Sequence, residues 1–288
     1  MYLLKSYDDS LQDILENGVP RTNQRTGIKT LSVFGMSSRY RLDTERFPIL
    51  TRRKVWPKSV FSELLWFISG STSNKDLKNL GCNFWTPWVD SEFTNKHNYE
   101  EEVFGPVYGF QLRHFGGDYN YGDHGDGYGS EGFDQLAWVI SRIKEDHSCR
   151  RALLTLWNPN DVSKMKLPPC HMLSQILVDD DRRLSLIMYQ RSCDWYIGVP
   201  ANIQFYSALA VMIAQQTGCT PYEFIHFTAD SHIYENQMDA VRKYLETPVI
   251  DSPKLEIKKS SSIEKYTQKD FILTNFNSGP KIDAPVAV

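Results

Sequence analysis

The 288-residue sequence predicts an α+β fold, a layered mixed β-sheet with buried and flanking helices. Three observations support this prediction. Apolar helical patterns precede and follow a cluster of strand-like runs, a polar segment typical of a hairpin turn joins two of those runs, and no linker or internal repeat divides the chain. We therefore expect a single domain over residues 1–288.

Three segments have helical patterns. Ser59–Ser69 is almost wholly apolar, which predicts a buried helix that ends at Gly70. Phe133–Lys144 places its apolar residues on one face, as a helix at the edge of a core does. Ile203–Gln216 is apolar on most sides, and Gly218 is expected to end it.

The strands of the sheet are expected in four apolar, β-branched or aromatic runs: Ala152–Trp157, Met172–Val178, Leu184–Gln190 and Phe224–Thr228. The acidic and basic residues of Val178–Leu184 are typical of a hairpin turn between two of these runs. Residues 115–132 are rich in glycine, which predicts a surface insertion within the domain.

Composition narrows the class of protein. Hydrophobic residues make up 41% and aromatic residues 13% of the chain, enough for a sizeable core. A net charge of −3 argues against a general nucleic-acid coat but allows local basic pockets for small phosphates. The longest apolar runs are too short to span a bilayer, and the N-terminal residues lack the pattern of a secretory signal. We expect a cytoplasmic protein that requires neither membrane nor nucleic acid.

The spacing of the cysteines also favours a cytoplasmic protein. The five cysteines are odd in number, widely spaced and never form a C-x-x-C pair. This pattern disfavours a disulfide framework and a structural zinc site, so we expect no metal. It leaves a thiol available for catalysis in a reducing compartment.

Cys170 is the first candidate nucleophile, because two prolines directly before it restrict the backbone that presents it. A nucleophilic cysteine needs positive charge near its thiolate. His171, the pair Arg150-Arg151 and the pair Gln190-Arg191 are the nearest candidates for that charge. The alternative is a buried cysteine with a purely structural role.

Glu63 lies inside an apolar helical run. Burial would raise the pKa of its carboxyl towards neutrality, which suits a group that transfers protons. The alternative is a glutamate on an exposed stripe of the helix.

Several polar residues are suited to a nucleotide. Arg191 and Ser192 can clamp a phosphate, since a guanidinium fork donates two hydrogen bonds and a hydroxyl adds a third. The Asn202 amide matches the O4 and N3–H edge of uracil, although a helix cap is an alternative. His232 and Tyr234 are two residues apart, so both can reach one sugar hydroxyl, with packing as the alternative.

Taken in order, these residues resemble the thymidylate synthase family over nearly the whole chain. Nine collinear runs carry the resemblance: Arg25–Gly27, Glu63–Phe67, Gly105–Gly109, Cys149–Arg151, Leu167–His171, Tyr189–Asp194, Gly198–Asn202, Asp230–Tyr234 and Ala284–Val288.

The resemblance implies reductive methylation of dUMP to dTMP by 5,10-methylenetetrahydrofolate. Cys170 would add to C6 of the pyrimidine, and C5 would then attack the methylene carbon of the folate. Glu63 and Tyr108 would manage the protons. A hydride from the folate would complete the methyl group.

The resemblance also implies the binding residues. The phosphate would be held by Arg25, Arg191 and Ser192, and by Arg150 and Arg151 from the second subunit of a homodimer. Asn202 would bind the base, and His232 and Tyr234 the 3′-hydroxyl, with Gln190 also on the substrate side. The folate would contact Trp85, Trp88, Asp194, Gly198 and the tail that ends at Val288.

The chain departs from the usual family pattern in the pocket, where Pro200–Tyr206 reads PANIQFY instead of PFNIASY. Trp56, Thr86 and Ala229 also stand where other residues are common. A polar Gln204 and the space left by Ala201 could admit water in place of hydride. A pyrimidine nucleotide hydroxymethylase is therefore the alternative enzyme, with uracil favoured over cytosine because Asn202 is not aspartate. A third alternative is an inactive homologue that acts as a binding protein.

Overall fold

The computed structural model describes residues 6–24, 26–42, 47–119 and 132–286. Its helices are α1 (Tyr7–Asn17), α2 (Pro57–Ser69), α3 (Asn74–Asn79), α4 (Ser91–His97), α5 (Tyr108–Arg113), α6 (Gln135–Glu145), α7 (Val199–Thr217) and α8 (Met238–Glu246), with short 3₁₀ turns that include η1 (Thr86–Trp88) and η3 (Glu235–Gln237). Its strands are β1 (Val19–Thr22), β2 (Lys29–Arg41), β3 (Leu153–Thr155), β4 (His171–Val178), β5 (Arg183–Asp194), β6 (Thr220–Tyr234), β7 (Lys254–Ile257) and β8 (Phe271–Thr274).

A mixed sheet of six strands lies at the centre of the described chain, in the order β1-β2-β6-β5-β4-β3. Only the pair β5 and β6 is parallel, and α7 connects these two strands. The β4–β5 hairpin puts His171 opposite Gln190, and the β5–β6 pair puts Asp194 beside His232. Residues from three separate sequence runs therefore meet at one end of the sheet.

Strand β6 has a buried face and an open face. Phe224 and His226 are fully buried on the side that packs against α7. Phe227, the residue after His226, points to the opposite face and is 43% exposed. On the same open face, Leu173 of β4 and Tyr189 of β5 are each 41% exposed, and the register places them in line with Phe227. Three large side chains in a row on an open face are a candidate contact surface.

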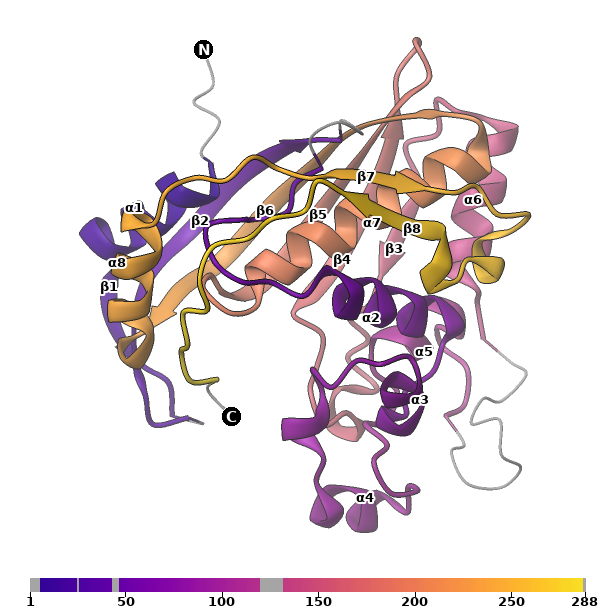
Figure 1. Ribbon diagram of the computed structural model, residues 1–288. Coiled ribbons are helices and arrows are strands. Elements are labelled where there is room, and N and C mark those ends of the chain that lie inside the picture. Colours follow the sequence, from indigo (N-terminus) through magenta and orange to yellow (C-terminus); the bar gives the residue numbers. More distant parts are fainter. Residues whose placement is uncertain (1–5, 25, 43–46, 120–131, 287–288) are drawn as a thin grey trace.

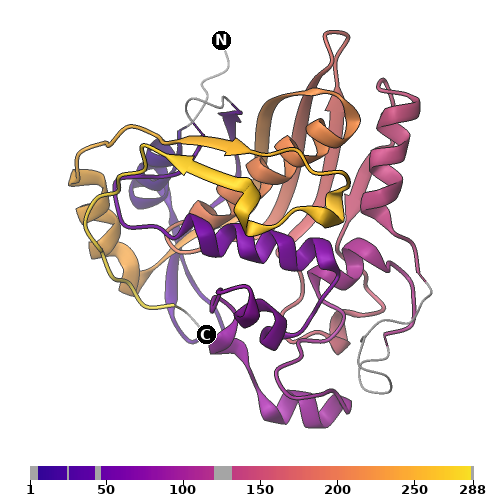
Figure 2. The ribbon, with the colours of Figure 1, turned by 45° about the vertical axis from the view of Figure 1, so that its right-hand side comes forward.

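Helix α7 is buried because it is apolar on nearly every side. It packs on β5 and β6, and the hairpin of β7 and β8 crosses over its outer side in both views (Figures 1 and 2). Gly218 ends the helix with a φ of +70°, a conformation that glycine adopts without strain. Helix α2 packs against both α7 and α5, so the Glu63 of α2 is carried to the same region as the start of α7.

The α+β prediction is confirmed, and most element boundaries agree within a few residues. The helix expected to start at Phe133 starts at Gln135, because Asp134 caps it by accepting the Ala137 N–H at 3.0 Å. The strand expected over Ala152–Trp157 pairs only over Leu153–Thr155. Of the glycine-rich insertion at residues 115–132, residues 120–131 lie outside the described chain. Within the described residues, no helix has the length and apolarity needed to span a membrane.

Candidate active site

Cys170 lies in the loop just before β4, and two side chains fix that loop. Its backbone N–H donates to the Tyr108 hydroxyl at 2.8 Å, and its carbonyl accepts the Arg191 N–H at 2.9 Å. The Arg191 guanidinium donates from Nε to the Pro169 carbonyl at 2.9 Å and from Nη2 to the Pro168 carbonyl at 2.8 Å. Cys170 is partly exposed and forms no disulfide bond with the other described cysteines. The nucleophile is therefore presented by a loop whose backbone is hydrogen-bonded on both sides.

The charge beside Cys170 comes from Arg191 and not from His171. Burial lowers the pKa of His171 to about 4, so this imidazole is neutral at pH 7. The suggestion that His171 supplies positive charge is therefore wrong, because the imidazole is buried in the folded protein. Its ring instead packs edge-on against Tyr108 and Tyr206, with centroids 5.3 and 5.2 Å away.

Glu63 has the environment that a proton-transfer group needs. Although the residue keeps a small exposure to solvent, burial raises the pKa of its carboxyl to about 7. The Trp85 indole donates to Glu63 Oε1 at 2.6 Å and partly opposes that rise. The Trp85 ring in turn meets the Tyr108 ring edge-on at 5.6 Å, so contacts run from Glu63 to Tyr108 and on to Cys170. The alternative of an exposed glutamate is excluded.

We predict that Glu63→Gln alters the pH dependence of stability. In the folded protein the carboxyl has a raised pKa, so its burial costs nothing below about pH 4.5 and costs most above about pH 7. Wild type should lose about 3 kcal/mol of unfolding free energy relative to Glu63→Gln as the pH rises from below 5 to 8. Urea denaturation at both pH values measures this. The exposed change Glu100→Gln is the control, and an equal pH response in both variants would contradict a buried, proton-holding Glu63.

Asn202 lies in the first turn of α7, where its side chain faces β5 rather than capping the helix. Its Oδ1 accepts a hydrogen bond from Gln190 Nε2 at 3.1 Å, and Gln190 Oε1 lies 2.9 Å from His226 Nε2. Gln190 is two residues from Ser192 and pairs with His171 across the β4–β5 ladder. Asn202, the residue predicted to bind the base, thus lies next to β5, which carries the predicted phosphate-binding residues Arg191 and Ser192.

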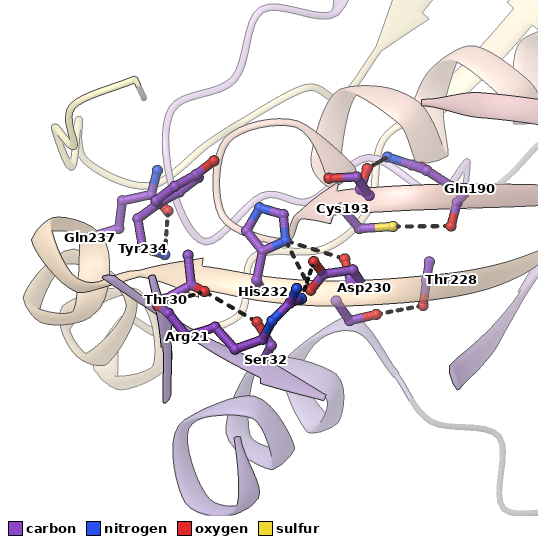
Figure 3. A network of polar contacts seen from close by, with 12 residues as sticks. Arg21, Thr30, Ser32, Gln190, Cys193, Thr228, Asp230, His232, Tyr234 and Gln237 are labelled. Atoms are coloured by element: carbon purple, nitrogen blue, oxygen red, sulfur yellow. Dashed lines mark hydrogen bonds and ion pairs between the residues drawn. The ribbon is translucent and has the colours of Figure 1, made fainter. Parts of the chain in front are cut away.

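His232 and Tyr234 lie at the end of β6, as Figure 3 shows. The His232 ring lies 3.2 Å from the Asp230 carbonyl through Nδ1, and its centroid is 5.1 Å from that of Tyr234. Arg21 of β1 forms an ion pair with Asp230 at 2.7 Å. Both predicted sugar-binding residues therefore share one side of the strand end, beside Ser192, whose register partner on β6 is Asp230.

Asp194 connects the end of β5 to the C-terminal segment. Its Oδ1 accepts the backbone N–H groups of Tyr196 and Ile197 at 3.0 and 2.9 Å. Its Oδ2 accepts from Gln237 Nε2 at 3.0 Å, and the same Gln237 nitrogen donates to the Pro285 carbonyl at 3.2 Å. Gln237 was missed by sequence reasoning, because its partners are distant in sequence and no local pattern marks it.

Arg150 and Arg151 are not brought to Cys170 within one chain. The Arg150 carbonyl accepts from Gln175 Nε2 at 2.9 Å. Gln175 is five positions along β4 from Cys170, which corresponds to roughly 16 Å of strand. Both arginines are exposed and line a hollow of about 490 Å³ with Arg142 and Cys149. They are therefore separated from Arg191 in the single chain.

The remaining predicted residues are Trp88, Gly198, Arg25 and Val288. Trp88 is half-buried and its ring meets that of Trp85 at 6.4 Å. Gly198 precedes α7, and its backbone N–H donates to the Asp194 carbonyl at 3.1 Å. Arg25 and Val288 lie outside the described residues. Across the described ranges, no group of three His, Cys, Asp or Glu side chains is placed to hold a metal ion.

The unusual residues of α7 pack inside the helix layer. Gln204 is 1% exposed, and its amide donates back to the Pro200 carbonyl of its own helix at 2.9 Å. Phe205 fills the space between α7 and α2, where its ring meets Phe67 at 4.9 Å. Ala201 remains partly exposed. Of the two enlarged residues, Phe205 thus fills the contact between α7 and α2, and Gln204 bonds within its own helix.

The family model described as Thymidylate synthase matches residues 5–288. The chain belongs to the thymidylate synthase family. It is 46% identical to the thymidylate synthase of Herpesvirus ateles over 92% of each chain. It is 43% identical to the human thymidylate synthase over 98% of this chain and 90% of the relative. It is 40% identical to the bifunctional dihydrofolate reductase-thymidylate synthase of Paramecium tetraurelia and spans 61% of that relative's length.

Membership of the thymidylate synthase family confirms the predicted resemblance and, with it, the predicted enzyme class of methyltransferase. Each relative named here carries thymidylate synthase in its name. The comparisons thus support the methylation prediction and give no support to the hydroxymethylase or to the inactive binding protein.

Proposed function

We propose that this member of the thymidylate synthase family methylates dUMP at C5 to give dTMP, with 5,10-methylenetetrahydrofolate as co-substrate. The observation that carries the proposal is one continuous set of contacts. It links Cys170 to Glu63 through Tyr108 and Trp85, and it links Cys170 to Asn202 through β5. A thiol, a carboxyl with a pKa near 7 and a base-reading amide are the groups that this reaction requires.

Each of these groups has a distinct task. The Cys170 thiolate attacks C6 of the pyrimidine, which makes C5 nucleophilic. Burial raises the pKa of Glu63 to about 7, so it can both give and take a proton at the base near neutral pH. The Tyr108 hydroxyl accepts the Cys170 N–H, and burial raises its pKa, so it keeps its own proton to donate.

The residues near Asp194 fit a folate. Bound folate supplies the methylene carbon and the hydride. Trp88 is half-buried and offers aromatic surface to a ring system, and the buried Trp85 ring packs behind it. Asp194 accepts three hydrogen bonds from the protein, which leaves acceptor capacity on its carboxylate for the N–H groups of a pterin. The segment around Pro285 is held beside that carboxylate by Gln237, where it can cover a bound ligand.

We also propose that residues 1–288 form one catalytic domain that works as a cytoplasmic homodimer. Phe34, Tyr189 and Phe227 are 41–59% exposed and line a hollow of about 530 Å³ that includes Arg191. A second subunit on this face would cover them and bring Arg150 and Arg151 towards the phosphate. This arrangement explains why the two arginines lie far from Arg191 within one chain.

Two measurements on the purified protein with dUMP and methylenetetrahydrofolate test the proposal. Methylation oxidises the folate, so the near-ultraviolet absorbance of dihydrofolate should rise in step with a product of dTMP mass. A hydroxymethyl product without dihydrofolate would establish the alternative enzyme. Nucleotide binding with no product would establish the inactive homologue.

We predict that Asn202→Asp shifts preference from uracil towards cytosine nucleotides. A carboxylate repels uracil O4, whereas it can accept from the cytosine amino group. Because the lost pair would be buried, the ratio of kcat/KM for dUMP and dCMP should fall roughly tenfold to a hundredfold. The exposed change Asn95→Asp is the control. Parallel changes for both nucleotides would show that Asn202 does not read the base.

A further inference from the structure

His226 is a buried histidine on β6 that has no part in the proposed chemistry of Cys170, Glu63 and Tyr108. Its side chain has no solvent exposure, and its Nε2 lies 2.9 Å from Gln190 Oε1. Its Nδ1 has no hydrogen-bond partner among the residues that the structure describes. A buried imidazole with one bonded and one unbonded nitrogen holds its proton at a defined position.

The position of that proton follows from the hydrogen bond between Gln190 and the Ser192 carbonyl. Gln190 Nε2 lies 3.1 Å from the Ser192 carbonyl, which can only accept, so the NH₂ group of Gln190 must face it. The amide oxygen of Gln190 then faces His226, whose Nε2 must donate. Burial lowers the pKa of His226 to about 3, so the ring is neutral and carries a single proton. That proton is on Nε2.

The same logic fixes the orientation of Asn202. The second hydrogen of the Gln190 amide points to Asn202 Oδ1 at 3.1 Å. The oxygen of Asn202 therefore faces Gln190, so its NH₂ group points away from Gln190 and can donate to a bound base, with His171 as a further neighbour of the amide. Uracil offers an acceptor at O4 and a donor at N3, which match this orientation. Cytosine reverses both, so it would require a turned amide whose NH₂ group opposes the NH₂ group of Gln190.

We propose that His226 is a positioning residue that determines base specificity: its Nε2–H fixes the Gln190 amide, which holds Asn202 in the orientation that selects uracil over cytosine. This inference rests on the proposed function, because it assumes that Asn202 binds the base. Without the donor, Gln190 Oε1 is left buried and unpaired, and the Gln190 amide turns away to satisfy it. Asn202 then loses the hydrogen bond from Gln190 that fixes its orientation.

The packing around His226 allows the donor to be removed without a cavity. Its ring lies nearly parallel to those of Phe224 and Trp195, with centroids 5.5 and 6.4 Å away. Phenylalanine fits such a stack and cannot donate, so His226→Phe is the test variant. His226→Gln restores an N–H donor of similar reach and is the matched control.

The experiment measures the Kd of dUMP and of dCMP by calorimetry in the dimeric protein without folate. Wild type and His226→Gln should prefer dUMP, and His226→Phe should reduce that preference roughly tenfold or more. Equal weakening for both nucleotides would mean that His226 is only structural, which overturns the inference while the proposed function stands. A wild-type protein that binds neither nucleotide would overturn the proposed function and this inference with it.

A measurement on the wild-type protein keeps the inference testable if His226→Phe does not fold. Nitrogen-15 NMR of labelled histidine distinguishes the two neutral tautomers of a ring. The expected result is a proton on Nε2 of His226, assigned by comparison with His226→Gln. A proton on Nδ1 would overturn the inference, because Gln190 Oε1 would then have no donor.

Discussion

Cys170→Ser should abolish turnover of dUMP and leave nucleotide binding largely intact. The serine hydroxyl stays protonated at neutral pH and is a far weaker nucleophile than a thiolate, so kcat should fall about a thousandfold or more. The backbone contacts of the loop to Tyr108 and Arg191 do not involve the side chain of Cys170, so the fold of the loop should survive. Single-turnover product analysis and calorimetric dUMP binding measure the two effects separately.

The matched control is Cys219→Ser, which changes a partly buried thiol in the turn between α7 and β6. That turn is at the end of α7 opposite to Asn202, so activity should stay close to wild type. Substantial residual turnover in Cys170→Ser, or an equal loss in Cys219→Ser, would contradict the role assigned to Cys170.

Mixing two inactive proteins should restore activity if Arg150 and Arg151 act across the subunit interface. One protein carries Arg150→Ala and Arg151→Ala, and the other carries Cys170→Ser. In a hybrid dimer, one site then bears both lesions and the other bears neither. Random exchange makes about half of all dimers hybrids, so about a quarter of wild-type activity should return. Refolding the mixture from denaturant permits the exchange.

The opposite arrangement gives a clear alternative outcome. If the arginines serve the site of their own chain, every site of a hybrid keeps one lesion and activity stays near zero. The roughly 16 Å of strand between the Arg150 contact on β4 and Cys170 makes that outcome unexpected for one compact phosphate. Each parent protein refolded alone is the control for incomplete inactivation.

Much of the site could be predicted from sequence because its residues lie in short runs. Cys170 is marked by its two prolines, and Arg191 with Ser192 by the chemistry of a phosphate clamp. Glu63 could be assigned a raised pKa because most of its neighbours along the helix are apolar. For these residues, the neighbouring residues in the sequence are enough to indicate the chemical role.

The rest depends on contacts between distant segments. His171 was one of the candidates for the positive charge near Cys170, but it is buried beside the rings of Tyr108 and Tyr206 and is neutral at pH 7. Gln237 acquires its partners only when η3 folds against the end of β5. His226 is a polar residue at an inward position of a core strand, and that alternation is the one sequence signal that could have drawn attention to it.

Arg191 ties the loop of the nucleophile to the place where a phosphate would bind. Two of its nitrogens hold the carbonyls of Pro168 and Pro169, and its remaining N–H groups are the ones left for an anion. A bound phosphate would therefore restrict the motion of the same side chain that holds the loop carrying Cys170, and so would help to position the thiol relative to the pyrimidine ring. A nucleoside without its phosphate would consequently lose alignment as well as affinity, and its reaction would be slow even at saturation.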